Sequence, residues 1–165
     1  MGRGCTAAVL CLLLTGCGYQ LVRYELPSAA GPCVHVDDLD PGAAHVQVAL
    51  WASSVLRTEL APHVCKSGEP GAHLTGKVQW VQQDQSLQTV DDAGGVHVGG
   101  VWAAAATIEL TRDGEVIWGP HGVEVTREFL STGSAVTEMD AMDTNLRLLS
   151  ESLAQALVKL LYEKR

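Results

Sequence analysis

Apolar residues recur every three or four positions in two segments of the chain, which is the spacing of one face of an α-helix. The first segment covers residues 44–60, where Asp40 and Pro41 suit the N-cap and the first helical position. The second lies near the C-terminus, where Thr137 and Asp140 are spaced like a capping box. Its stripe lasts only about three heptads, so packing on a sheet is favoured over a coiled-coil partner. The stripe consists of Met139, Met142, Leu146, Leu149, Leu153, Leu157, Leu160 and Leu161.

Alternating apolar and polar residues predict strands in the middle of the chain. A short strand over residues 33–36 ends at Asp37-Asp38, and longer strands are expected at residues 74–80 and 101–110. Residues 82–95 are polar and fit either a loop or two strands that run out past the core. The residues expected to share a face are Leu74, Gly76, Val78 and Trp80 in one strand, and Trp102, Ala104, Ala106, Ile108 and Leu110 in the other.

Asp113-Gly114 is a strong signal for a two-residue hairpin turn, so another strand should follow it. That strand begins at Glu115, is interrupted at Gly119-Pro120 and resumes over residues 123–129. Because proline has no N–H to donate, the interruption indicates an edge strand or a bulge.

The first sixteen residues have the pattern of an export signal. Arg3 precedes a mostly apolar run over residues 6–14, much shorter than the roughly 20 residues that a membrane-spanning helix needs. Leu14-Thr15-Gly16-Cys17 then resembles the bacterial lipobox, so we expect Cys17 to be the lipidated first residue of the mature chain. The alternative is an ordinary secretory signal in which Cys17 is incidental. Gly18 stands where an Asp would favour inner-membrane retention, which favours delivery to the outer membrane.

Without its signal the chain keeps ten Lys and Arg against nineteen Asp and Glu, a net charge of −9. So acidic a chain argues against nucleic acid as a partner. Cys5 and Cys11 leave with the signal, and Cys33 and Cys65 remain besides the lipidated cysteine. In an oxidising compartment these two favour one disulfide, although two separate buried thiols are the alternative.

The chain offers little for catalysis or metal binding. Its six histidines, at positions 35, 45, 63, 73, 97 and 121, lack the close spacing of metal ligands on one strand or helix. Neither Asp91-Asp92 nor the Asp37-Asp38-x-Asp40 cluster has the spacing of an EF-hand loop. Gly-x-Ser-x-Gly and phosphate-loop motifs are absent. We therefore expect a protein that is not an enzyme, with no cofactor and no metal, whose four tryptophans build core rather than a ligand cage.

The order of parts resembles the LPS-assembly lipoprotein family, LptE, the small subunit of the outer-membrane lipopolysaccharide translocon. The resemblance rests on Thr15-Gly16-Cys17-Gly18-Tyr19-Gln20-Leu21, on Leu74-Thr75-Gly76-Lys77-Val78, on residues 104–110 with Arg112-Asp113-Gly114-Glu115-Val116-Ile117-Trp118, and on the Leu-rich terminal helix. It implies an α/β (α+β) sandwich, in which two helices pack on one face of a mixed, roughly four-stranded sheet. It also implies a partner, the β-barrel LptD, inside which the lipoprotein acts as plug and assembly aid and contacts lipopolysaccharide.

On this basis residues 1–16 are a removed signal peptide, 17–32 a lipidated tether, and 33–165 a single LptE-like domain on the periplasmic side of the outer membrane. Two departures from the family are a short segment before the strand at residue 74 and the strong negative charge. The candidate contacts for lipopolysaccharide or the partner are Lys77, Arg112 and Arg127, which are scattered in sequence and so favour a protein partner over the polyanionic lipid. Polar loops at the sheet end, residues 84–100 and 112–115, are the expected contact surface. The alternatives are an envelope lipoprotein without a barrel partner and a small hydrolase.

Overall fold

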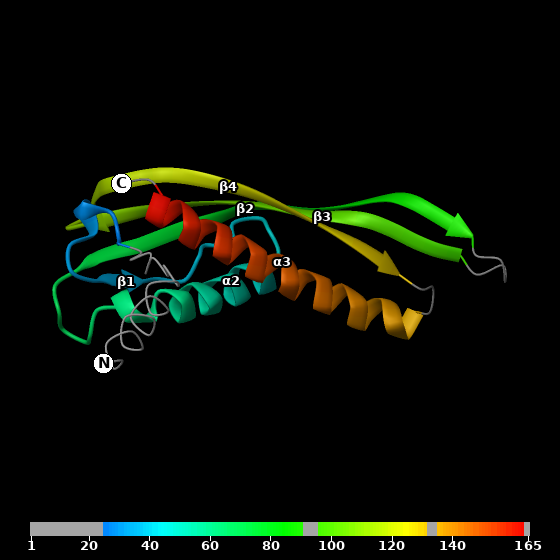
Figure 1. The fold of residues 1–165 in the computed structure, drawn as a ribbon, viewed down its shortest axis with the longest axis horizontal. Helices are drawn as coiled ribbons and strands as arrows, with labels where there is room; N and C mark the ends of the chain where they lie inside the picture. Colours follow the sequence, from blue (N-terminus) through cyan, green and yellow to red (C-terminus); the bar gives the residue numbers. More distant parts are fainter. Residues whose placement is uncertain (1–24, 91–95, 132–134, 164–165) are drawn as a thin grey trace, which may run out of the picture.

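Two α-helices lie on one face of a four-stranded sheet in the computed structural model, which describes residues 25–90, 96–131 and 135–163 (Figure 1). This confirms the expected fold class. Two short 3-10 helices complete the described part. The elements are η1 (Ser28–Ala30), β1 (Val34–Val36), α2 (Val46–Glu59), η2 (Ala61–His63), β2 (Ala72–Val90), β3 (Val96–Arg112), β4 (Glu115–Ser131) and α3 (Ala135–Glu163).

The sheet is mixed, and its strands lie in the order in which they follow one another in the chain. β1 pairs with the start of β2 in parallel, whereas β2, β3 and β4 form an antiparallel meander. Figure 1 shows the β2–β3 hairpin running out beyond both helices. Of the two alternatives for residues 82–95, the structure shows strands, since β2 continues to Val90 and β3 resumes at Val96.

The core lies between the helices and one face of the sheet. The predicted face of β3 is confirmed, because its alternate residues from Trp102 to Leu110 are all buried. α3 packs its leucine stripe against both α2 and the sheet, as expected of a helix that covers a sheet. The fully buried leucines of α3 are Leu146, Leu149, Leu153, Leu157 and Leu161.

Both helices begin away from the predicted caps. α2 begins at Val46 after the N-cap His45, so the prediction that Asp40 caps it is wrong. The backbone of Asp40 instead extends the pairing along β2, accepting from the N–H of Val78 at 2.8 Å and donating to the carbonyl of Gly76 at 2.9 Å. α3 begins at Ala135, before Thr137, so Thr137 is not its cap either.

A bulge in β2 corrects the predicted face of Trp80. Val78 pairs with Ala106, but Trp80 pairs with Ala105, so one extra residue of β2 lies between these pairs. Because side chains alternate along a strand, the extra residue moves Trp80 to the face opposite Val78. Of the four tryptophans expected in the core, Trp102 is buried there and Trp51 and Trp118 pack against it, whereas Trp80 does not.

The predicted turn and the predicted interruption are both confirmed. Asp113 and Gly114 both have positive φ, +54° and +83°, as a type I′ two-residue hairpin requires. At Gly119-Pro120 the register between β3 and β4 shifts, and β4 is the outermost strand of the sheet. The proline therefore lies at a bulge in an edge strand, where its missing N–H costs no ladder bond.

A disulfide joins Cys33, just before β1, to Cys65 in the loop after η2 (S–S 2.04 Å). The N–H of Cys65 also donates to the carbonyl of Val34 at 3.0 Å. Ala30 in η1 is fully buried, and Leu26 packs against the core. The packed part of the chain therefore begins before Cys33, inside the segment expected to be a tether.

Candidate partner-binding surface

Both described helices lie on one face of the sheet, and no helix of the described residues covers the other face (Figure 1). The register places alternate residues of three strands on it, beside one another. We call this set the open face. Its members are Trp80, Gln82 and Asp84 of β2, Val101, Ala103 and Ala105 of β3, and Glu124, Thr126 and Glu128 of β4.

The open face has an apolar centre and acidic sides. Ala103 and Ala105 are each only 7% exposed although neither described helix covers them, because short side chains on a central strand lie below their neighbours. Asp84 on one side and Glu124 and Glu128 on the other are exposed, and the set contains no Lys or Arg. The surface therefore suits a partner that offers apolar contacts flanked by positive charge.

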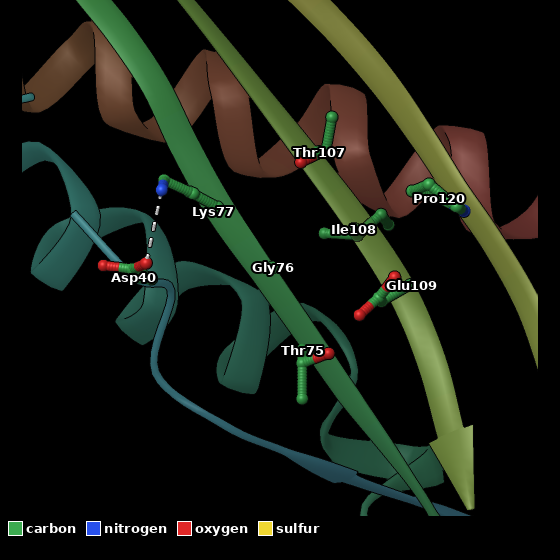
Figure 2. Close-up of a pocket in the computed structure, with 8 residues that line it drawn as sticks. All are labelled: Asp40, Thr75, Gly76, Lys77, Thr107, Ile108, Glu109 and Pro120. Atoms are coloured by element: carbon green, nitrogen blue, oxygen red, sulfur yellow. Dashed lines mark ion pairs between the residues drawn. The ribbon is translucent and has the colours of Figure 1, made fainter. Parts of the chain in front are cut away.

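A shallow depression of about 260 Å³ lies nearer the start of β2 (Figure 2). Lys77 points toward Asp40, with 3.8 Å between Nζ and Oδ2, and away from Glu109 and Pro120. No Ser, Cys or His lines the depression, so it has no side chain of these three types to act as a nucleophile or a general base. The depression is smaller than the roughly 300–1,000 Å³ usual for small-molecule sites.

The three predicted basic contacts are not brought together. Lys77 pairs with Thr107, Arg127 pairs with Trp102, and Arg112 ends β3, so the three are spaced about 17 Å apart along that strand. Lys77 is on the side away from the helices, whereas Arg127 is on the side of the buried Trp102. They form no common site for a polyanion.

Arg112 has a structural partner instead. Its Nη2 donates to the carbonyls of Ala29 and Ala30, at 3.1 Å each, and so holds the segment containing η1 against the end of the sheet. The signal for this role is absent from the local sequence, because the two carbonyls come from a distant part of the chain.

The prediction that residues 84–100 and 112–115 form one surface at a single sheet end is wrong. In an antiparallel meander successive turns lie at opposite ends, and the turn at Asp113-Gly114 is about 40 Å along β3 from Gly100. The first segment is also strand over residues 84–90 and 96–100, and the second is a two-residue turn between the ends of two strands. A surface that uses strands β2 to β4 must therefore be the face or the edges of the sheet.

Other predicted features can be placed only in part. Cys17, the predicted lipidation site, lies outside the described residues. In the described ranges no helix combines the length and the apolar character needed to cross a membrane. No cluster of three or more His, Cys, Asp or Glu suited to a metal ion occurs within those same ranges.

No model of a known protein family matches the chain, and no curated protein is detectably similar in sequence. Several solved structures are similar in shape. A minor lipoprotein from Acinetobacter baumannii is 13% identical, with 79% of this chain and 90% of that one covered and a TM-score of 0.47. A lipoprotein from Caulobacter crescentus is 11% identical, with 78% of this chain and 87% of that one covered and a TM-score of 0.48. The rare lipoprotein B from Shewanella oneidensis is 12% identical, with 78% of this chain and 90% of that one covered and a TM-score of 0.45.

Proposed function

We propose that this protein is an outer-membrane lipoprotein that binds and helps to assemble or plug an LptD-type β-barrel, without catalysing a reaction. The lipobox at Leu14-Thr15-Gly16-Cys17 supports lipid anchoring on the periplasmic side, because two or three acyl chains hold a protein stably at a membrane. In this proposal residues 1–16 are removed and the described domain faces the barrel.

The observation that carries the proposal is the open face. A long sheet covered by helices on one side only, with an apolar centre between acidic sides, is a surface built for another protein rather than for a small molecule. The edges of the sheet add to it. Among the described strands none lies on the outer side of β4. Beside β2, pairing with β1 and then with the backbone of Asp40 ends at Val78, so the later part of β2 and the outer side of β4 are open to strand pairing within the described residues.

The charge of the open face favours one of the two partners that the family resemblance implies, the barrel protein, over the other, lipopolysaccharide. A lipopolysaccharide carries several negative charges, and the open face is acidic where the lipid would need Lys or Arg. Lys77, Arg112 and Arg127 are separated, and Arg112 already binds two carbonyls. Contact with the barrel protein is therefore the primary function proposed, and direct contact with lipopolysaccharide is secondary.

Charge reversal on the open face tests this function. The variant Glu124→Lys/Glu128→Lys should reduce the amount of barrel protein that co-purifies with the lipoprotein from its native membrane at least tenfold, because like charges at an interface cost several kcal/mol. The matched control is Glu59→Lys/Asp143→Lys, which changes charge equally on the exposed sides of α2 and α3. The control should co-purify as the wild type does.

Three results would contradict the proposal or its contact surface. Recovery of the wild-type lipoprotein without any large barrel protein would exclude the partnership and favour an envelope lipoprotein that acts alone. Depletion of the lipoprotein should also leave lipopolysaccharide stranded in the periplasm, and normal delivery of lipopolysaccharide after depletion would exclude the translocon function. Equal losses in both charge variants would show that the open face is not the contact surface.

A further inference from the structure

The edge of β2 that faces β1 is used by the fold over its first part only. β1 pairs with the start of β2 (Figure 1). Asp40 then continues this pairing, since it donates to the carbonyl of Gly76 and accepts from the N–H of Val78. Beyond that point the chain leaves the edge and enters α2. No described strand lies beside this edge of β2 over residues 79–90.

The backbone groups that point toward this edge follow from the side of the sheet on which each side chain lies. Gly76 and Val78 use the edge, and both pair with buried core residues of β3, so both belong to the helix side. Along a strand the direction of the N–H and C=O groups alternates together with that of the side chain. After the bulge, Val81 and Gln83 are the residues that pair with buried core residues of β3. Their N–H and C=O groups are therefore directed to the free edge.

A hollow of about 470 Å³ lies beside this edge, where α2 begins next to Val81. Its lining is mainly apolar, and Val46 is 57% exposed there. On the opposite side of the sheet Trp80 is half-buried. Because side chains alternate along a strand, an added strand would place every second side chain in the hollow and the others beside Trp80. The lining residues are Ala43, Ala44, His45, Val46, Gln47 and Val81.

The two free edges of the sheet differ in the features that prevent strand pairing. Exposed edges are usually protected by proline, by bulges and by charged side chains. β4 contains Pro120, shifts of register near it, and the exposed Glu124 and Glu128. Residues 79–83 of β2 include no proline and no charged residue, and the bulge lies where pairing with Asp40 ends. The free edge of β2 is therefore the one suited to strand addition.

We propose that the free edge of β2 binds an extended segment of a protein partner, with apolar side chains toward the hollow and basic side chains toward the open face. The basic side chains would lie near Asp84 and the other acidic residues of the open face. A second copy of this chain fits poorly, because the net charge of −9 on each mature chain would bring like charges together. That the segment belongs to the barrel protein rests on the proposed function, whereas strand addition at this edge does not.

Amide hydrogen exchange, followed by NMR, measures strand addition directly. The full-length lipoprotein in a neutral detergent is titrated with a short synthetic peptide of alternating lysine and valine, blocked at both ends. The peptide should slow exchange at the amides of Val81 and Gln83 about tenfold and leave those of β4 unchanged. A peptide with glutamate in place of lysine should have no such effect. Unchanged exchange at both amides with millimolar lysine peptide, or equal slowing along β4, would overturn the proposal.

Two matched pairs of variants test the edge and the hollow. Gln83→Pro removes an N–H directed to the edge, whereas Gln83→Ala keeps it. Proline is tolerated in an edge strand where its N–H side faces solvent, so Gln83→Pro should remain folded by circular dichroism and weaken peptide binding about tenfold. Val46 and Leu50 are similarly exposed on α2, 57% and 55%, but only Val46 lines the hollow. Val46→Gln should weaken binding about fivefold, since an apolar contact is lost. Gln83→Ala and Leu50→Gln should bind as the wild type does, and equal effects within both pairs would contradict the proposal.

The complex purified from the native membrane separates this inference from the proposed function. If the barrel protein co-purifies while the amides of Val81 and Gln83 exchange as fast as in the lipoprotein alone, the barrel does not bind at this edge and the proposed function stands. If no barrel protein co-purifies, the proposed function fails, and the peptide titration still decides whether the edge accepts a strand.

Discussion

Ser53→Ala removes the acceptor of a buried backbone N–H, and Ser150→Ala provides a matched control. Both serines are fully buried, and both hydroxyls donate to the carbonyl four residues earlier in their helix at 2.7 Å. Only Ser53 also accepts, from the N–H of Leu39 at 2.9 Å. Leu39 is itself 4% exposed, so water cannot readily replace the lost acceptor.

The magnitude follows from what each substitution leaves behind. Leaving a buried donor unsatisfied costs about 1–3 kcal/mol of unfolding free energy, whereas the helical carbonyls keep their main-chain partners after the hydroxyl is lost. Alanine is a better helix former than serine by up to about 0.7 kcal/mol, and this gain is common to both variants. The unfolding free energy of Ser53→Ala should therefore be lower than that of Ser150→Ala by about 1–3 kcal/mol.

Urea unfolding followed by tryptophan fluorescence and by circular dichroism measures this difference, using protein without residues 1–16 and with Cys17→Ser. For a domain of this size 1 kcal/mol corresponds to roughly 2–4 °C in Tm, so a thermal scan should agree. The dependence on urea should be the same in both variants. If their unfolding free energies agree within about 0.5 kcal/mol, the Ser53–Leu39 bond does not contribute as argued.

Further predictions concern the disulfide and the hairpin turn. Cys33→Ala/Cys65→Ala opens a loop with a sequence separation of 32 and should cost about 3.7 kcal/mol in urea unfolding; a cost under 1 kcal/mol would contradict this. Gly71→Ala places a Cβ against Cys65 Sγ and should destabilise the protein, and its cost should shrink when both cysteines are absent; additive costs in that double-mutant cycle would disprove the clash. Gly114→Ala, at φ +83°, should lower Tm by a few degrees, whereas an unchanged Tm would show that the turn tolerates a side chain.

Local patterns predicted most of the elements. The turn at Asp113-Gly114 depends on residues next to one another, and the buried face of β3 depends on strict alternation, so both could be predicted from the sequence. The face of Trp80 could not, because one extra residue in β2 reverses the side chains from Trp80 to Asp84 without changing the local alternation, and the register shifts again before Leu87. The predicted start of α2 was wrong because the backbone of Asp40 pairs with β2 instead of capping the helix.

The candidate sites depend on contacts between distant segments. Val46 and Val81 line one hollow only because α2 begins beside β2, which spacing along the chain does not indicate. Lys77 and Arg127 were expected as contacts, yet their positions on opposite sides of the sheet follow from strand register alone. Sequence reasoning could therefore name residue types for a surface but not decide which of them share it.

The position of the disulfide in the sequence affects the order in which parts of the domain can fold when the N-terminal part of the chain becomes available first. Cys33 and Cys65 enclose β1, α2 and η2, and both cysteines precede Ala72, where β2 begins. The two cysteines can therefore form their disulfide before β2, the partner strand of β1, is available. β2, β3 and β4 can then form from their own turns, since antiparallel hairpins need only nearby residues. The disulfide-bonded segment from Cys33 to Cys65 and the meander of β2, β3 and β4 would then fold as two units. β1 would join the sheet when these two units dock, rather than by forming a hairpin.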